Sequence, residues 1–181
     1  MFLIFIYVFL LHLAGMKRLI LLFVFFWNLE NFFDNHDGGY SPSDAEFSSR
    51  GARHWTRRRF DAKCNAVAKT LFLAADHFGE LPDVAAFAEV ENVGVLRNLL
   101  SRTSLRKCNY RPLLFESPDR RGIDVGLIYR ADRLRLVSAR PQGVPGIQTR
   151  DILVACFVSV EADSLALMVC HYPSKYGGRA S

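Results

Sequence analysis

Five apolar runs of strand length restrict the fold of this chain more than any other feature of its sequence. They are LILLFVFFW at residues 19–27, DVAAFAEV at 83–90, DVGLIYR at 124–130, ILVACFVSV at 152–160 and SLALMVCH at 164–171. Runs so poor in polar residues are typical of buried strands. The sequence therefore predicts a sheet inside a layered domain, with a hairpin where the polar turn Glu161–Ser164 separates the last two runs.

Two other segments have helical spacing. Apolar residues at positions 60, 64, 67, 71 and 74 share one face and predict an amphipathic helix over residues 57–76. Asn92 is placed to cap a second, shorter helix. The order of strand, helix, strand, helix and then several strands predicts an α/β domain of the α+β type, with one mixed, mainly antiparallel sheet and covering helices.

The composition is compatible with one domain. The 181 residues are 50% apolar and 13% aromatic, which permits a sizeable core and argues against wholesale disorder. The net charge of +5 admits a polyanionic partner without requiring one. None of the four cysteines stands in a C-x-x-C pair, which argues against structural zinc and favours buried free thiols.

The first 27 residues fit two interpretations. MFLIFIYVFLL is a run of 11 apolar residues, too short to cross a bilayer by itself. Lys17–Arg18 followed by an apolar stretch is similar to a signal peptide, but no small-residue cleavage site follows. Residues 19–27 are therefore either an export segment or the first strand, and residues 1–18 form a signal-like or membrane-associated leader. Export, membrane contact through the N-terminus and a cytoplasmic location all stay open.

Polar residues stand where several apolar runs stop. Asn28 and Glu89 end two of them, Arg120 and Arg121 lie in the turn before a third, and His171 ends the last. Successive strand ends converge at one edge of an α/β sheet. Glutamate is a hard ligand for Mg²⁺, arginine binds phosphoryl oxygens, and histidine donates to developing negative charge. Each residue taken alone is more often a turn former or surface charge.

Four motifs together are more specific. FWNLENFFD, PDVAAFAEVEN, SPDRRGIDVGLIYR and VCHYPSKYGG occur in this order and resemble the endonuclease/exonuclease/phosphatase superfamily, the metal-dependent phosphoesterases related to DNase I and exonuclease III. The resemblance extends from about residue 19 to the last residue. It implies a DNase I-like sandwich and hydrolysis of a phosphodiester by water, assisted by Mg²⁺ or Mn²⁺.

The resemblance also implies residue roles. Asn28 matches an asparagine that orders the phosphate, and Glu89 matches the metal-binding glutamate, although Ala88 replaces the usual glutamine before it. His171 matches a histidine that contacts the scissile phosphate. Arg120 and Arg121 are candidate phosphate-binding residues. Asp124, which precedes a core strand, is expected to orient its neighbours.

Two motifs of that superfamily are missing from this sequence. D-x-N, which activates the attacking water, and S-D-H, which completes the site, do not occur. We therefore expect residues 19–181 to form a truncated domain, about one half of the sandwich, and expect the chain to be weakly active or inactive. The alternatives are a non-catalytic remnant of a truncated or frameshifted nuclease gene, and a small membrane-attached protein. The basic balance and the RRGID motif favour nucleic acid as substrate.

Overall fold

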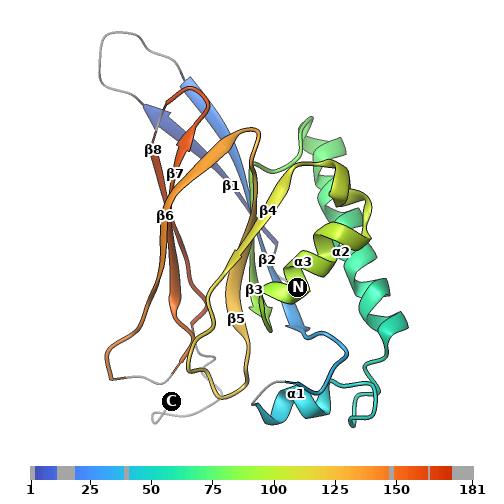
Figure 1. Ribbon diagram of the computed structural model, residues 1–181. Coiled ribbons are helices and arrows are strands. Elements are labelled where there is room, and N and C mark those ends of the chain that lie inside the picture. Colours follow the sequence, from blue (N-terminus) through green and yellow to red (C-terminus); the bar gives the residue numbers. More distant parts are fainter. Residues whose placement is uncertain (1–2, 12–18, 39–40, 147–148, 163, 173–181) are drawn as a thin grey trace.

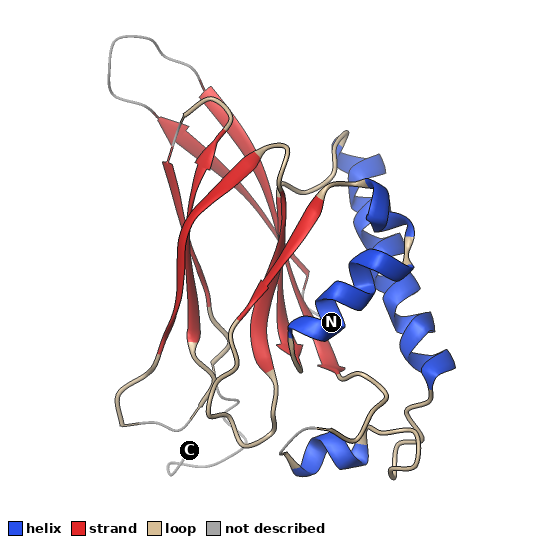
Figure 2. Cartoon of the chain, in the orientation of Figure 1, coloured by secondary structure: helices blue, strands red, loops and turns tan. Residues whose placement is uncertain are grey.

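Two sheets and a layer of helices make up the protein (Figures 1 and 2). The computed structural model describes residues 3–11, 19–38, 41–146, 149–162 and 164–172. One sheet has five strands, the other has three, and they face each other. The helices cover the opposite face of the five-stranded sheet. The predicted α/β class and partial DNase I-like sandwich are confirmed.

The five-stranded sheet has the order β1-β2-β3-β5-β4. The strands are β1 Leu3–Leu11, β2 Leu19–Phe32, β3 Val84–Val90, β4 Tyr110–Leu114 and β5 Asp124–Arg130. Strands β2 and β3 are parallel, and the other pairs are antiparallel. Because β2 and β3 are parallel, their carboxyl ends, which carry Asn28 and Glu89, lie at the same edge of the sheet.

The helix layer is fixed by capping and by one apolar stripe. α2, Arg57–Phe78, begins at Thr56, whose hydroxyl accepts a hydrogen bond from the Arg59 amide, and ends at Gly79 with φ of 86°, a left-handed angle that favours glycine. α3, Val93–Arg102, is capped by the Asn92 side chain as predicted. The short helices are α1, Pro42–Glu46, and the 3₁₀ turn η1, Ser104–Lys107. The buried face of α2 comprises Phe60, Cys64, Val67, Ala68, Leu71 and Ala74.

The three-stranded sheet corrects one expectation. β6 Leu134–Gln142, β7 Ile152–Ser159 and β8 Ser164–Val169 form a separate sheet of order β6-β7-β8 rather than extending the first. The reason is that β5 already pairs with β3 on one side and with β4 on the other. With no free edge on β5, the chain turns after Arg130 and packs β6 to β8 over the open face.

A second core fills the space between the sheets. Leu153, Ala155, Phe157, Leu165 and Val169 point from the smaller sheet toward residues such as Val125, Leu127 and Tyr129 of the larger one. The rings of Tyr129 and Phe157 lie 5.0 Å apart. The alternation of inward and outward residues means that only one face of the β7–β8 hairpin is buried.

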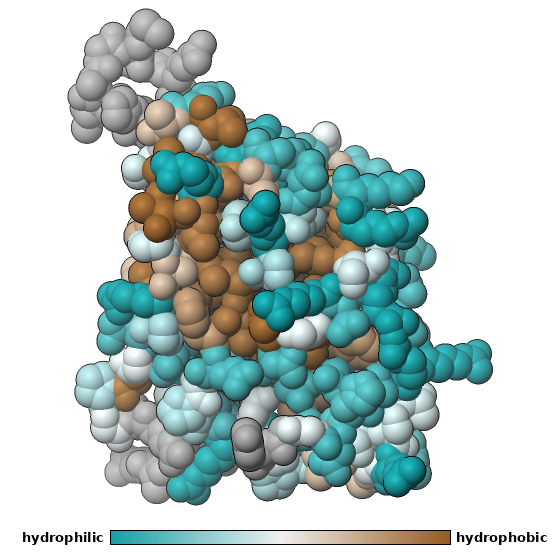
Figure 3. All heavy atoms as spheres, viewed as in Figure 1, coloured by the Kyte–Doolittle hydropathy of each residue, from teal (hydrophilic) through white to brown (hydrophobic). Residues whose placement is uncertain are grey.

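The outer face of the smaller sheet is partly apolar. Met168 and Val137 are 74% and 55% exposed, and Figure 3 shows apolar atoms gathered over the strands in the upper part of the view. The apolar side chains exposed on the smaller sheet are therefore confined to its outer face, because its inner face packs against the larger sheet. The four cysteines are free thiols. Cys64 is buried, and the other three are partly exposed.

The N-terminal segment pairs with the fold where it is described. Strand β1, Leu3–Leu11, runs antiparallel to β2, with Leu11 opposite Leu19. Of the two interpretations of residues 19–27, the structure has the strand. Residues 12–18 lie outside the described residues, so the leader boundary at residue 18 stays a prediction. No helix within the described ranges is long and apolar enough to span a membrane.

Candidate functional site

The centre of the site is a bulge between β2 and β3. Asn28 is opposite Ala88 and Phe32 is opposite Val90, so that three residues of β2 face the single residue Glu89. Glu30, Asn31 and Glu89 have φ angles of 56°, 59° and 61°, in the left-handed region that non-glycine residues rarely adopt. Bulges of this kind redirect side chains at the rim of a sheet. Here the bulge turns Glu89 toward the groups that bind it.

The Glu89 carboxylate accepts three hydrogen bonds or close polar contacts. Asn28 Nδ2 lies 3.2 Å and His171 Nε2 lies 3.3 Å from Oε1, and the Asn31 amide donates to Oε2 at 3.0 Å. His171, followed by Asn28 and the Asn31 amide, stabilises the charged form and lowers the pKa of Glu89 to about 2, against a partial opposing effect of burial. Glu89 is therefore an anion throughout the neutral range.

Three of the sequence-predicted site residues thus lie together. Asn28 and Glu89 come from the larger sheet, whereas His171 follows β8 of the smaller sheet, so the site joins the same edge of both sheets. The segment after Tyr172 that carries the rest of the VCHYPSKYGG motif lies outside the described residues. The individual roles of Asn28, Glu89 and His171 stay predictions.

The predicted arginines are less closely tied to this centre. Arg120 and Arg121 are both exposed, and Arg121 Nε lies 3.8 Å from Asp119 Oδ1. The same aspartate binds a different arginine more closely. Arg150 Nη2 lies 3.1 Å and its Nε lies 3.3 Å from Asp119 Oδ2.

Sequence reasoning missed Arg150. Its side chain is 4% exposed, and its Nη1 is buried without a hydrogen-bond partner among the described residues. Burial lowers the pKa of Arg150, while the charges of Asp119 and Glu89 raise it, so the guanidinium lies within electrostatic reach of both carboxylates. The available signal was an arginine placed directly before an apolar strand, in TRDILVACF.

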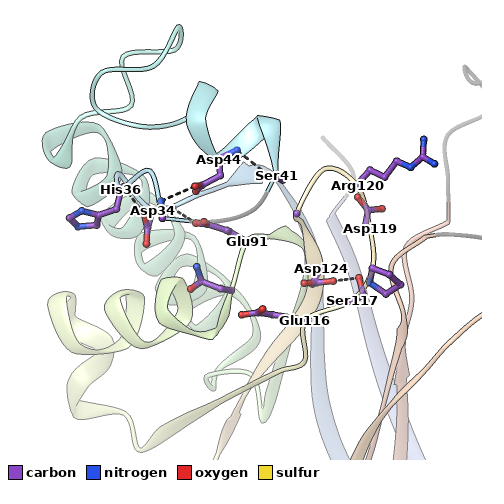
Figure 4. A pocket seen from close by; sticks show the side chains of 14 residues that line it. Asp34, His36, Ser41, Asp44, Glu91, Glu116, Ser117, Asp119, Arg120 and Asp124 are labelled. Carbon is purple, nitrogen blue, oxygen red and sulfur yellow. Dashed lines mark hydrogen bonds between the residues drawn. The ribbon is translucent and has the colours of Figure 1, made fainter.

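A cavity of about 500 Å³ is lined by Glu91, two residues after Glu89, but not by Asn28, Glu89 or His171 themselves (Figure 4). Side chains from the segment after β2, from α1 and from the turn before β5 point into it. Six of the lining residues are acidic: Asp34, Asp44, Glu91, Glu116, Asp119 and Asp124. Arg120 also lines this cavity.

Burial raises the pKa of two of these acids into the neutral range, so each is at least partly protonated at pH 7. Burial, with a hydrogen bond to Asp44, raises the pKa of Glu91 to about 8. Burial raises the pKa of Asp124 to about 7, although its hydrogen bond from the Ser117 hydroxyl opposes the rise. Through that bond Asp124 is tied to the SPDRRG turn, and its orienting role stays a prediction.

The donor set fits a weakly ligated hard cation. Within the described segments, no group of three or more His, Cys, Asp and Glu side chains is arranged to hold a metal. Glu89 nevertheless offers an ionised carboxylate whose Oε2 accepts only one hydrogen bond, and each carboxylate oxygen can accept two. Mg²⁺ is commonly held by one or two carboxylates together with water and substrate phosphates. Glu89 is the residue that would hold it here.

A family profile identifies the family, and two solved structures show the shared fold. The profile of the Endonuclease/Exonuclease/phosphatase family matches residues 23–181. A humanized TDP2 of D. rerio carrying 14 mutations superposes with a TM-score of 0.53 at 16% identity, covering 85% of this chain and 48% of that one. The human Nocturnin catalytic domain with bound sulfate gives 0.51 at 16% identity, covering 85% and 51%.

These two structures show the shared fold, and the chain spans about half of their length. No curated protein matches its sequence. The family match covers most of the chain, from the middle of β2 onward. The chain belongs to the endonuclease/exonuclease/phosphatase family.

Proposed function

We propose that this chain carries the cation- and phosphate-binding half of a metal-dependent phosphodiester hydrolase of the endonuclease type. The observation that supports the proposal most strongly is the ionised Glu89, held by Asn28, the Asn31 amide and His171. A carboxylate kept charged by neighbouring donors at the rim of two sheets is suited to binding Mg²⁺ or Mn²⁺.

Each residue has a distinct role in this proposal. Glu89 holds the cation, and Asn28 fixes the orientation of the carboxylate. His171 presents an N–H group to the phosphoryl oxygens, because it lies beside Glu89. Arg150 is buried and adds positive charge that attracts the phosphate. When bound, the divalent cation neutralises phosphate charge and stabilises the leaving oxygen. Arg120 and Arg121 are exposed and would contact the substrate farther from the reacting phosphate.

Nucleic acid is the proposed substrate class. The net charge of +5 favours a polyanion, and lysine and arginine side chains that neutralise a phosphate backbone supply much of its affinity. A membrane contact through the N-terminus, with export or membrane association, is a separate proposal. Finding the protein only in the soluble fraction after cell lysis would refute the membrane contact.

The second candidate is a non-catalytic chain that binds the same ligand. It is favoured by the described part of the chain, in which no group of three or more His, Cys, Asp and Glu side chains is arranged to hold a metal. Hydrolysis needs a group that activates water, and the roles proposed above for Asn28, Glu89, His171 and Arg150 do not include one.

One pair of assays tests both candidates. Fluorescence anisotropy of a labelled oligonucleotide with and without Mg²⁺ measures binding, and plasmid nicking measures turnover. We expect Mg²⁺-dependent binding that Glu89→Gln removes, with turnover at or near background. Glu161→Gln is the matched control, since this exposed acid lies in the β7–β8 turn. Nicking that depends on Glu89 would exclude the non-catalytic candidate. If the protein neither binds the oligonucleotide nor nicks the plasmid, the proposed function is overturned.

A further inference from the structure

Lys63 of α2 reaches into the bulge that orients Glu89. Its Nζ donates a hydrogen bond to the Glu30 carbonyl at 2.9 Å and to the Asn31 carbonyl at 3.3 Å. The same ammonium lies over two aromatic rings, 5.4 Å from the centre of Phe32 and 5.5 Å from the centre of Trp55. A lysine partly buried among carbonyls and rings is held in one place, unlike a lysine on an open helix surface.

The two carbonyls need such a donor because of the bulge. Between Asn28 and Phe32 the regular pairing of β2 with β3 is interrupted, so the ladder does not fix this stretch of backbone. Glu30 and Asn31 both have left-handed φ angles, a conformation that persists only where surrounding contacts impose it. Lys63 supplies contacts to both of these residues.

The contact passes directly to Glu89. The carbonyl of Asn31 accepts from Lys63, and the amide of the same residue donates to Glu89 Oε2 at 3.0 Å. Movement of Asn31 would therefore alter one of the bonds that orient the carboxylate. Burial lowers the pKa of Lys63 to about 8, so the side chain remains mostly cationic at neutral pH.

We propose that Lys63 is a positioning residue: by binding the Glu30 and Asn31 carbonyls it holds the bulge in the shape that aims Glu89 at a divalent cation. The cation in this statement rests on the proposed function, whereas the action on Asn31 does not. Lys63 touches neither cation nor substrate and acts only through the backbone of the bulge. Its replacement should therefore affect Glu89 without removing a ligand.

Three variants separate positioning from general support of the fold. Lys63→Met keeps the apolar stem and removes the donor, Lys63→Arg keeps a cationic donor, and Lys69→Met makes the same change at an exposed position of the same helix. Mn²⁺ affinity is measured by titration, and amide hydrogen exchange is measured residue by residue by NMR. Urea unfolding of each variant reports global stability. Lys63→Gln replaces Lys63→Met if the latter does not fold.

We expect Lys63→Met to weaken Mn²⁺ binding about tenfold or more, the range typical for loss of an outer-shell partner. The Asn31 amide should exchange about tenfold faster than in the wild type. Amides in the middle of α2 should keep their wild-type exchange rates once any change in the global free energy of unfolding is allowed for. Lys63→Arg should recover most of both effects, and Lys69→Met should show neither.

Two outcomes would overturn the inference. One is a Lys63→Met protein whose Asn31 exchange and Mn²⁺ affinity equal those of the wild type. The other is faster exchange that is spread evenly over all amides, which would show a general loss of stability. If the wild type binds no Mn²⁺, the proposed function fails, but selective exchange at Asn31 and its recovery in Lys63→Arg still decide whether Lys63 positions the bulge.

Discussion

The charge of Glu89 should be visible as a pH-dependent contribution to stability. In the folded protein its pKa is about 2 against an ordinary 4.5. A carboxylate whose pKa is lowered by folding stabilises the protein above its unfolded pKa, and the contribution is lost as pH falls through the folded value. The side chain is 13% exposed, so screening by solvent removes little of the effect. Replacement by glutamine removes the charge at every pH.

The magnitude follows from the two pKa values. Protonation of Glu89, with these folded and unfolded pKa values, lowers the free energy of unfolding by about 2 kcal/mol as the pH falls from about 6 to about 3. Hydrogen-bond donors approach both oxygens of the Glu89 carboxylate. In Glu89→Gln an NH₂ group replaces one of these oxygens, so at neutral pH one donor faces another donor and loses its hydrogen bond. Losing a charge-assisted hydrogen bond costs about 1.5–3 kcal/mol. Glu89→Gln should therefore be less stable than wild type by about this amount near neutral pH, and the difference should shrink toward acid.

Urea unfolding followed by tryptophan fluorescence, at several pH values between about 3 and about 7, measures this difference. Titrating groups far from Glu89 act equally on both proteins and cancel in the comparison. Glu161→Gln, an exposed acid at the β7–β8 turn, should remain within about 0.5 kcal/mol of wild type throughout. A difference between wild type and Glu89→Gln that stays constant with pH would show that the fold does not hold Glu89 as an anion.

Three further predictions concern the cavity, the buried arginine and the second sheet. Glu91→Gln should raise the urea midpoint at about pH 8 and flatten the pH dependence, because a carboxyl whose pKa rises to about 8 destabilises the fold as pH climbs above its unfolded value; an unchanged pH profile would contradict this. Arg150→Met should lower the free energy of unfolding by about 3 kcal/mol, since it leaves Asp119 in its nearly buried site with only the more distant Arg121 as a described cationic partner; an effect below about 1 kcal/mol would mean that the pair is open to water. Phe157→Ala should cost about 3–5 kcal/mol in the same assay, because this ring is 1% exposed between the sheets; a near-zero effect would refute the packing of the two sheets.

Most secondary structure was predictable because the hydrophobic pattern is strong. The helix expected at residues 57–76 runs over Arg57–Phe78, and the strand expected at 83–90 runs over Val84–Val90. The polar turn after β7 does lead into β8. In each case the buried face requires apolar residues at a regular spacing or in a continuous run, and this pattern can be read directly from the sequence.

Sheet partition was not predictable from the same patterns. The run RLRLVS follows β5 after a short turn and lies in β6, yet β6 pairs with β7 in the other sheet. The decision depends on β4, which occupies the free edge of β5. β4 was not expected at all, because its sequence YRPLL is short and contains proline, which is disfavoured within strands. One unrecognised strand therefore changed the predicted number of sheets.

The site divides along a similar line. Asn28, Glu89 and His171 could be proposed together because each follows an apolar run within a motif, and motifs are visible in sequence. Lys63 and Arg150 could not, because their importance comes from what surrounds them: two carbonyls exposed by a bulge in one case and a buried aspartate in the other. A residue that binds backbone atoms leaves no complementary side chain in the sequence to reveal it. Residues that support a site through the backbone therefore require the structure, even where the residues they support are already apparent.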